Sequence, residues 1–285
     1  MAGLSALVVL AAGRARRYGG VKPLAPIGPK DEAVIDLLAG DALRAGFRRL
    51  VLVINPDTGP LIEAHVAASW PPDVDVLFAV QPRPVGTVDA VLAARGSVDE
   101  SAPFGIANAD DLYGTDALKV LGHHLATKGT DCLVGFRLDR ALVGDLPVTR
   151  GVCSVEDGVL VGIAERRKVT HRDGAFRADD GIDPATLDPS SLVSMNLWGF
   201  APSMWGTLAD AMSKAADASE DDEVLLPELV GRLVGQAGEQ SRFEVLSTTS
   251  RCIGVTHPDD LELVRAEIAD EVARGERPSG AFDPA

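Results

Sequence analysis

The sequence predicts an α/β fold with a mostly parallel central sheet and helices on both of its faces. Apolar strand-like runs alternate with helical segments through the first half of the chain, which is the pattern of a doubly wound sheet. The runs Leu4–Ala12 and Leu50–Ile54 are apolar almost without interruption, as strands buried on both faces are. The chain has 285 residues, 46% of them hydrophobic and 24% charged, which is a globular composition.

The first half is expected to alternate strictly between strands and helices. The expected strands are Leu4–Ala12, Leu50–Ile54, Val74–Val80, Phe104–Ala109 and Asp131–Phe136. The expected helices are Glu32–Ala45, Pro60–Ser69, Thr87–Arg95 and Asp116–Lys128.

The second half changes character and predicts an inserted, β-rich lobe. Asp157-Gly158 supplies the turn of a hairpin between Gly151–Val155 and Val159–Ala164, and a polar stretch from Lys168 to Ser190 is expected to be a long loop or flap. The remaining expected elements are the strand Leu192–Phe200, the helices Pro202–Ala216 and Glu223–Val234, the strand Phe243–Ser247 and the helix Pro258–Arg274.

No linker divides the chain, so one domain over residues 1–275 is expected. Within it, residues 1–136 form one half, 137–257 the half with the inserted lobe, and 258–275 a last helix. Residues 276–285, together with Gly275, are expected to be a frayed tail.

The charge excludes some partners. Asp and Glu total 42 against 27 Lys and Arg, a formal net charge of −15, which is the wrong sign for gripping nucleic acid or an anionic membrane surface. Three scattered cysteines without a Cys-x-x-Cys pair predict neither a disulfide framework nor a zinc site. The apolar start is too short to span a bilayer and lacks the features of a signal peptide, so a cytoplasmic location is expected.

The most informative stretch is a basic loop that follows the first expected strand. The strand ends in the small residues Ala11-Ala12-Gly13, and three arginines and Lys22 follow. Small residues let backbone N–H groups approach a phosphate closely, and Arg and Lys offset polyphosphate charge. The loop is not a Walker loop, because proline follows Lys22, nor a dinucleotide fingerprint, because Ala15 replaces the second glycine. A basic surface loop without a ligand is the alternative.

The pattern Leu-Ala-Ala-Gly-x-x-x-Arg-x-Gly-Gly-x-Lys-Pro-Leu, Leu10–Leu24 here, resembles the signature loop of the sugar-phosphate nucleotidyltransferase superfamily and of the related molybdopterin nucleotidyltransferases. The resemblance implies a three-layer, Rossmann-like (GT-A-like) fold whose loop wraps a nucleoside triphosphate. It implies that Arg17 and Lys22 bind and polarise the phosphates, although Ala15 stands where many members have glycine. The nucleotide-binding residues that it implies in the loop are Leu10, Ala11, Ala12, Gly13 and Arg14.

The segment Gln81–Ala90 resembles the family's Gln-x-x-x-x-Gly-Thr-x-x-Ala motif. The resemblance implies that Gln81, Gly86 and Thr87 recognise the nucleobase. An amide can both donate to and accept from a base edge, and a glycine lets the ring lie against the backbone. A proline-rich turn that caps a helix at Thr87 is the alternative.

Two aspartates follow the fourth expected strand, at the edge of the sheet where ligands bind in open α/β folds. A carboxylate there can hold Mg²⁺, which prefers oxygen ligands and bridges phosphate oxygens. The resemblance implies that Asp110 is the metal ligand and makes Asp111 a second candidate. Capping of the next helix is the alternative and fits Asp111 better.

The second half resembles the family's sugar-binding half. Gly151 and Glu165 on the expected hairpin, and Asn196 on the strand Leu192–Phe200, match its sugar-contacting positions. Carboxylates and amides suit sugar hydroxyls because they accept and donate in defined directions. An exposed charge at a strand end and a strand-edge amide are the alternatives.

The match is weakest near the C-terminus. Ile253–Leu261 resembles the family's closing segment, but Thr256 stands where an Asp or Asn often supplies a second metal ligand. Either Asp110 suffices, with triphosphate and water completing the shell, or Asp179 or Asp180 contributes.

The resemblance therefore implies a Mg²⁺-dependent enzyme that transfers a nucleotidyl group from a nucleoside triphosphate to a sugar 1-phosphate, for the biosynthesis of a nucleotide sugar. Further phrases, such as Val193–Phe200, resemble a bacterial branch whose substrates are mostly unassigned. A non-catalytic nucleotide-binding regulator of the same fold and cytidylyl transfer to a non-sugar phosphate remain open. A glycosyltransferase is disfavoured, because Asn108-Ala109-Asp110 is not an Asp-x-Asp motif.

Overall fold

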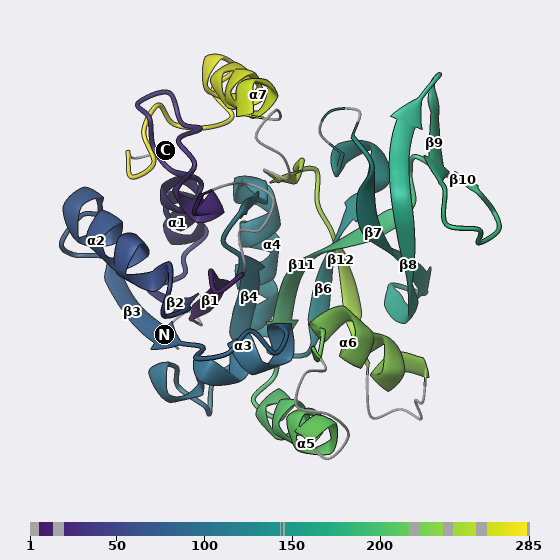
Figure 1. The fold of residues 1–285 in the computed structure, drawn as a ribbon, viewed down its shortest axis with the longest axis horizontal. Coiled ribbons are helices and arrows are strands. Elements are labelled where there is room, and N and C mark those ends of the chain that lie inside the picture. Colours follow the sequence, from purple (N-terminus) through teal and green to yellow (C-terminus); the bar gives the residue numbers. More distant parts are fainter. Residues whose placement is uncertain are drawn as a thin grey trace.

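The computed structural model describes residues 6–13, 20–142, 144, 146–216, 223–235, 242–254 and 261–283. Its centre is one large mixed sheet (Figure 1). The strands β1 (Leu7–Leu10), β2 (Arg49–Ile54), β3 (Asp75–Val80) and β4 (Phe104–Asn108) run parallel, in the order β4-β1-β2-β3.

The sheet continues past β4 into the second half of the chain. There β11 (Leu192–Phe200) pairs antiparallel with β4 and with β6 (Cys132–Arg137), and β12 (Glu244–Ser247) pairs parallel with β6. The strands β7 (Val148–Glu156) and β8 (Val159–Arg172) form a long hairpin. The hairpin joins the sheet because β7 pairs with β11 and β8 pairs with β12. The α/β class, with its mostly parallel first half, is thereby confirmed.

Helices cover both faces of the sheet. On one face lie α1 (Val34–Arg44), α2 (Gly59–Ser69) and α4 (Gly114–Thr127), and on the other α3 (Thr87–Ala93), α5 (Met204–Ala216) and α6 (Leu226–Gly235) (Figure 1). Successive residues of a strand point to opposite faces of the sheet, so Val9 packs in the core on the α1 side while Val8 packs in the core on the α3 side. Burial on both faces is why the runs of β1 and β2 are apolar throughout.

Smaller elements complete the structure. β5 (Asp111–Leu112) pairs antiparallel with β13 (Ile253–Gly254), and α7 (Leu261–Ala273) packs through Val264 and Ile268. The 3₁₀ turns are Lys22–Leu24, Arg95–Ser97 and Leu138–Arg140.

The expected flap from Lys168 to Ser190 is wrong. The strand β8 continues to Arg172 and turns into β9 (Ala175–Ala178), which pairs with β10 (Thr186–Leu187). The turn is made by Asp173-Gly174, both with positive φ, 52° and 73°. Asp157-Gly158 forms a turn of the same kind, also with positive φ at both residues. The Asp-Gly pair that indicates a hairpin was therefore present in the sequence at 173–174.

The expectation of a frayed tail is also wrong for the described residues. Ala281 is buried, and its carbonyl accepts a hydrogen bond of 2.7 Å from Nη1 of Arg44 on α1. The ring of Phe282 lies edge-on to Trp70, with centroids 5.7 Å apart. Gly40 permits this crossing, because a Cβ there would collide with the Ala281 carbonyl.

Candidate active site

Three adjoining pockets lie at the carboxyl ends of β1 and β4 and along β11. We call them the loop pocket, of about 90 Å³, the central pocket, of about 420 Å³, and the lobe pocket, of about 320 Å³. Leu10, Gly13 and Asp110 line both the loop and central pockets. The central and lobe pockets share Thr87, Asn108, Asn196 and Leu225, so the three form one continuous cleft.

A lysine and a carboxylate meet where the loop and central pockets join. Lys22 begins the 3₁₀ turn after the loop, and its Nζ lies 3.7 Å from Oδ2 of Asp110, at the end of β4. Burial raises the pKa of Asp110, and the charge of Lys22 opposes that rise. The Asp110 side chain keeps 36% of its surface exposed, so its oxygens are accessible from the cleft.

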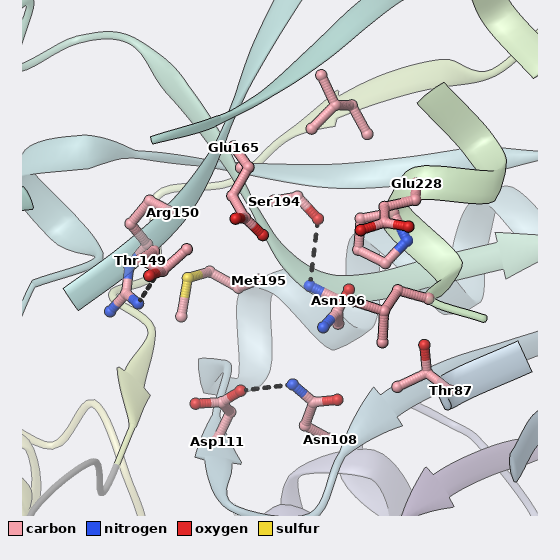
Figure 2. A pocket seen from close by; sticks show the side chains of 14 residues that line it. Thr87, Asn108, Asp111, Thr149, Arg150, Glu165, Ser194, Met195, Asn196 and Glu228 are labelled. Carbon is pink, nitrogen blue, oxygen red and sulfur yellow. Dashed lines mark hydrogen bonds between the residues drawn. The ribbon is translucent and has the colours of Figure 1, made fainter. Parts of the chain in front are cut away.

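Asp111 is placed differently. Its Oδ2 accepts a hydrogen bond of 2.9 Å from Nδ2 of Asn108, and it lines the lobe pocket (Figure 2). Burial, together with the neighbouring charge of Asp110, raises the pKa of Asp111 to about 7. The hydrogen bond from Asn108 occupies one of the two oxygens that Asp111 could offer to a cation.

The predicted base-recognition segment lines the central pocket. The buried Gln81 donates from Nε2 to the Gly86 carbonyl at 3.0 Å and to Oδ2 of Asp89 at 2.9 Å, so its amide nitrogen is held by the protein. The hydroxyl of Thr87 accepts a 2.7 Å hydrogen bond from the amide of Leu226. Thr87 therefore joins α3 to the start of α6, in addition to lining the cleft.

Position 86 requires a glycine because of its backbone conformation and because of the atoms packed against it. Its φ is +105°, and a Cβ would lie 2.4 to 2.7 Å from backbone atoms of Val224. Two backbone hydrogen bonds hold this contact, from Val88 to the Val224 carbonyl and from Val224 to the Val85 carbonyl.

Gly86→Ala is expected to lower the free energy of unfolding by roughly 2–4 kcal/mol, through positive-φ strain and overpacking against Val224. Urea denaturation measures the loss. The control is Gly174→Ala, where φ is +73° but no atom lies within 4 Å, so only the strain of roughly 1–2 kcal/mol is expected. Equal losses for the two variants would contradict the packing argument.

The segment 223–228 lines the cleft, and sequence reasoning missed it. Glu223 lines the central pocket, Leu225 both the central and lobe pockets, and Pro227 and Glu228 the lobe pocket. The sequence shows only an acidic run before an amphipathic helix, which is typical of a helix start. The pairing of this segment with Val85 and Val88 is what brings it to the cleft.

The lobe pocket gathers the predicted sugar-binding residues (Figure 2). Gly151 on β7 lies opposite Glu165 on β8, and Gly151 also faces Ser194 on β11. Asn196 sits at an irregularity of β11 with φ +59°, a region that Asn tolerates better than most residues. The irregularity places its amide at the junction of the central and lobe pockets.

Arg150 was also missed, although it lines the lobe pocket beside Gly151. Burial lowers its pKa, and the charge of Asp111 opposes that change. A lone arginine in a strand carries no motif, so no sequence signal pointed to it.

The two alternative metal ligands, Asp179 and Asp180, directly follow β9 and contact residues of β8. Both carboxylate oxygens of Asp180 accept from the buried Arg166, at 2.8 and 3.2 Å, and Asp179 is exposed beside Lys168. Within the described residues no group of three or more His, Cys, Asp or Glu could hold a metal ion. Thr256, Arg14, Ala15 and Arg17 lie outside the described residues.

The predicted site residues that the structure describes thus meet in one cleft, although their individual roles remain predictions. They are Leu10, Ala11, Ala12, Gly13, Lys22, Gln81, Gly86, Thr87, Asp110, Asp111, Gly151, Glu165 and Asn196.

Comparison with known proteins gives a consistent result. Residues 7–141 match the family model described as nucleotidyl transferase, and this segment contains β1 to β6 with the loop and Asp110. The first half of the chain is thus similar to the nucleotidyl transferases. No curated protein matched the sequence.

Several solved structures share the fold along nearly the whole chain. The inositol-1-phosphate CTP transferase from T. maritima superposes with a TM-score of 0.67 at 15% identity, over 94% of this chain and 97% of the other. HddC from Yersinia pseudotuberculosis, complexed with GMP-PN, gives 0.60 at 17%, over 93% and 99%. UDP-glucose pyrophosphorylase complexed with UDP-glucose gives 0.63 at 15%, over 94% and 99%.

These likenesses extend the shared fold beyond residue 141, into the lobe that carries Glu165 and Asn196. In the part of the chain that the structure describes, every helix is too short or too polar to cross a membrane.

Proposed function

We propose that this protein transfers a nucleotidyl group from a nucleoside triphosphate to a sugar 1-phosphate, releasing pyrophosphate and a nucleotide sugar. The observation that carries the proposal is the continuous cleft, in which Asp110 and Lys22 lie toward one end, Glu165 lies at the other and Asn196 lies between them. The nucleoside would occupy the central pocket and the sugar the lobe pocket. Asn108 and Asn196, which line both pockets, would lie near the joining phosphates.

The chemistry requires positioning and charge neutralisation more than covalent work. An oxygen of the acceptor phosphate attacks the α-phosphorus in line, a new P–O bond forms, and the bond to the β-phosphate bridging oxygen breaks. Pyrophosphate leaves with the electron pair. Lys22, held at the loop by its ion pair with Asp110, would neutralise charge on the triphosphate, and the cleft walls would align the two reactants.

The residues present fit a magnesium ion. Asp110 offers accessible carboxylate oxygens at the junction of two pockets, and Mg²⁺ is commonly held by one or two carboxylates, with substrate phosphates and water completing the octahedron. When bound, the ion would supply Lewis-acid stabilisation of the phosphate oxygens. Asp111, one of whose oxygens accepts a hydrogen bond from Asn108, would be the second candidate ligand.

The proposal is tested by pyrophosphate release in the presence of Mg²⁺. The five triphosphates ATP, CTP, GTP, UTP and dTTP are each paired with hexose and hexosamine 1-phosphates. CTP with inositol 1-phosphate is included because a structurally similar protein is an inositol-1-phosphate CTP transferase. Release with one pair is expected to name both substrates. Triphosphate binding without release for any pair would contradict the enzyme and favour a binding protein.

A further inference from the structure

The lobe pocket has an unusual charge for a site that must receive a phosphate. The acidic residues that line it are Asp111, Glu165 and Glu228, and Arg150 is the one cationic residue among its described lining residues. Figure 2 shows Arg150 and Asp111 on one side of the pocket and Glu228 on the other. A phosphate dianion placed near Glu228 would be repelled, whereas near Arg150 it would be neutralised.

The guanidinium of Arg150 is held rigidly. Its Nε and Nη2 donate to the carbonyl of Ala141 at 3.1 and 2.8 Å, and its Nη1 donates to the carbonyl of Thr149 at 2.9 Å. A guanidinium has five N–H donors, so one N–H on each terminal nitrogen remains for another acceptor. A guanidinium that keeps one donor on each terminal nitrogen, within a fixed plane, can bind two phosphate oxygens at once.

Two other arginines of the hairpin, Arg166 and Arg167, are engaged elsewhere. Arg166 is buried, and it donates to Asp180 and to the carbonyls of Ile182 and Pro184. Arg167 is exposed and pairs with Glu165 at 2.8 Å, and neither arginine lines the lobe pocket.

We propose that Arg150 binds the phosphate group of the acceptor, a phosphate monoester, through its two remaining N–H donors. This inference rests on the proposed function, since it assigns the lobe pocket to the acceptor. Arg150 would hold two phosphate oxygens and leave the third free to attack the α-phosphorus. The carbonyls of Ala141 and Thr149 fix the guanidinium plane, so little side-chain entropy is lost on binding.

Arg150→Met is expected to raise the KM for the acceptor phosphate about 30-fold while the KM for the triphosphate changes less than about 3-fold. Arg150→Lys keeps the positive charge but lacks the paired N–H donors of the guanidinium, so an intermediate KM for the acceptor phosphate is expected. The matched control is Arg172→Met, which removes an exposed arginine from the same strand pair. Thermal denaturation of each variant reports whether the fold is retained.

Binding is also measured without turnover. Glucose 1-phosphate and inositol 1-phosphate are titrated calorimetrically into protein saturated with Mg²⁺ and a non-hydrolysable α,β-methylene triphosphate. Binding to the wild type that is lost in a folded Arg150→Met variant supports the inference, even if no pair releases pyrophosphate and the proposed function fails. Turnover with an unchanged acceptor KM in Arg150→Met overturns the inference and leaves the proposed function standing. Absence of binding by either phosphate to the wild type also overturns it.

Discussion

Asp110→Asn is expected to lower kcat for pyrophosphate release roughly 10³-fold, the largest loss of activity that we expect from a single substitution. The amide keeps the shape of the side chain but removes the negative charge that would hold a divalent cation at the junction of the loop and central pockets. It also leaves Lys22 without its partner 3.7 Å away. Steady-state kinetics across a Mg²⁺ titration measures both the loss and the weakened activation by the ion.

Asp111→Asn separates the two neighbouring carboxylates. The amide oxygen of an asparagine can still accept the hydrogen bond from Asn108, so a loss of about 5-fold or less is expected. A severe loss in Asp111→Asn with nearly normal turnover in Asp110→Asn would reverse the assignment of the metal ligand. Normal turnover in both variants would remove the basis for a cation at this end of the cleft.

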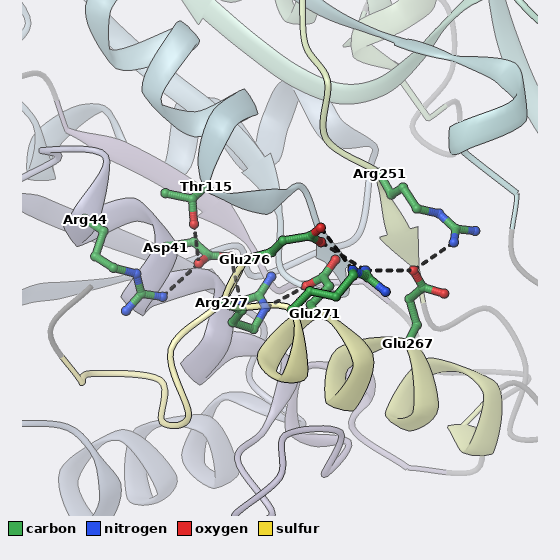
Figure 3. A network of polar contacts seen from close by, with 9 residues as sticks. Asp41, Arg44, Thr115, Arg251, Glu267, Glu271, Glu276 and Arg277 are labelled. Carbon is green, nitrogen blue, oxygen red and sulfur yellow. Dashed lines mark hydrogen bonds and ion pairs between the residues drawn. The ribbon is translucent and has the colours of Figure 1, made fainter.

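Arg277→Met is expected to lower the free energy of unfolding by about 3–5 kcal/mol, since it breaks a buried ion pair from one side. Arg277 is 5% exposed and Asp41 on α1 is fully buried, and Nη1 of Arg277 lies 2.8 Å from Oδ2 of Asp41 (Figure 3). The Asp41 carboxylate also accepts from Arg44 and Thr115, and removal of Arg277 leaves it buried without its third partner. Urea denaturation measures the loss.

Arg274→Met is the matched control, three residues earlier in the chain. Arg274 pairs with Glu276 at 2.9 Å, but its side chain is 48% exposed and the pair is solvated. An exposed pair contributes at most about 1 kcal/mol, so a small change is expected. Comparable losses in the two variants would show that the tail is not anchored by the Arg277–Asp41 pair.

Much of the fold could be predicted from the pattern of side chains. The strands around β1, β2 and β4 are apolar because both faces are covered, and that burial gives continuous runs which identify them without structural information. The prediction of a flap was wrong because Asp173-Gly174 forms a hairpin turn, as Asp157-Gly158 does, and only the turn at Asp157-Gly158 was predicted. The prediction of a frayed tail was wrong because Arg277 pairs with Asp41, which lies far away in the chain, and no local sequence pattern indicates such a pairing.

The candidate site divides in the same way. The sequence by itself pointed to the loop with Lys22, the Gln81–Thr87 segment and Asp110, because these residues match a family's motifs at short, fixed spacings. Only the tertiary structure decided that Arg150, Leu225 and Glu228 line the same cleft. Their places depend on strand pairing between β7 and β8 and on the contact of Val224 with Gly86, and such long-range pairings leave no periodic trace in the chain.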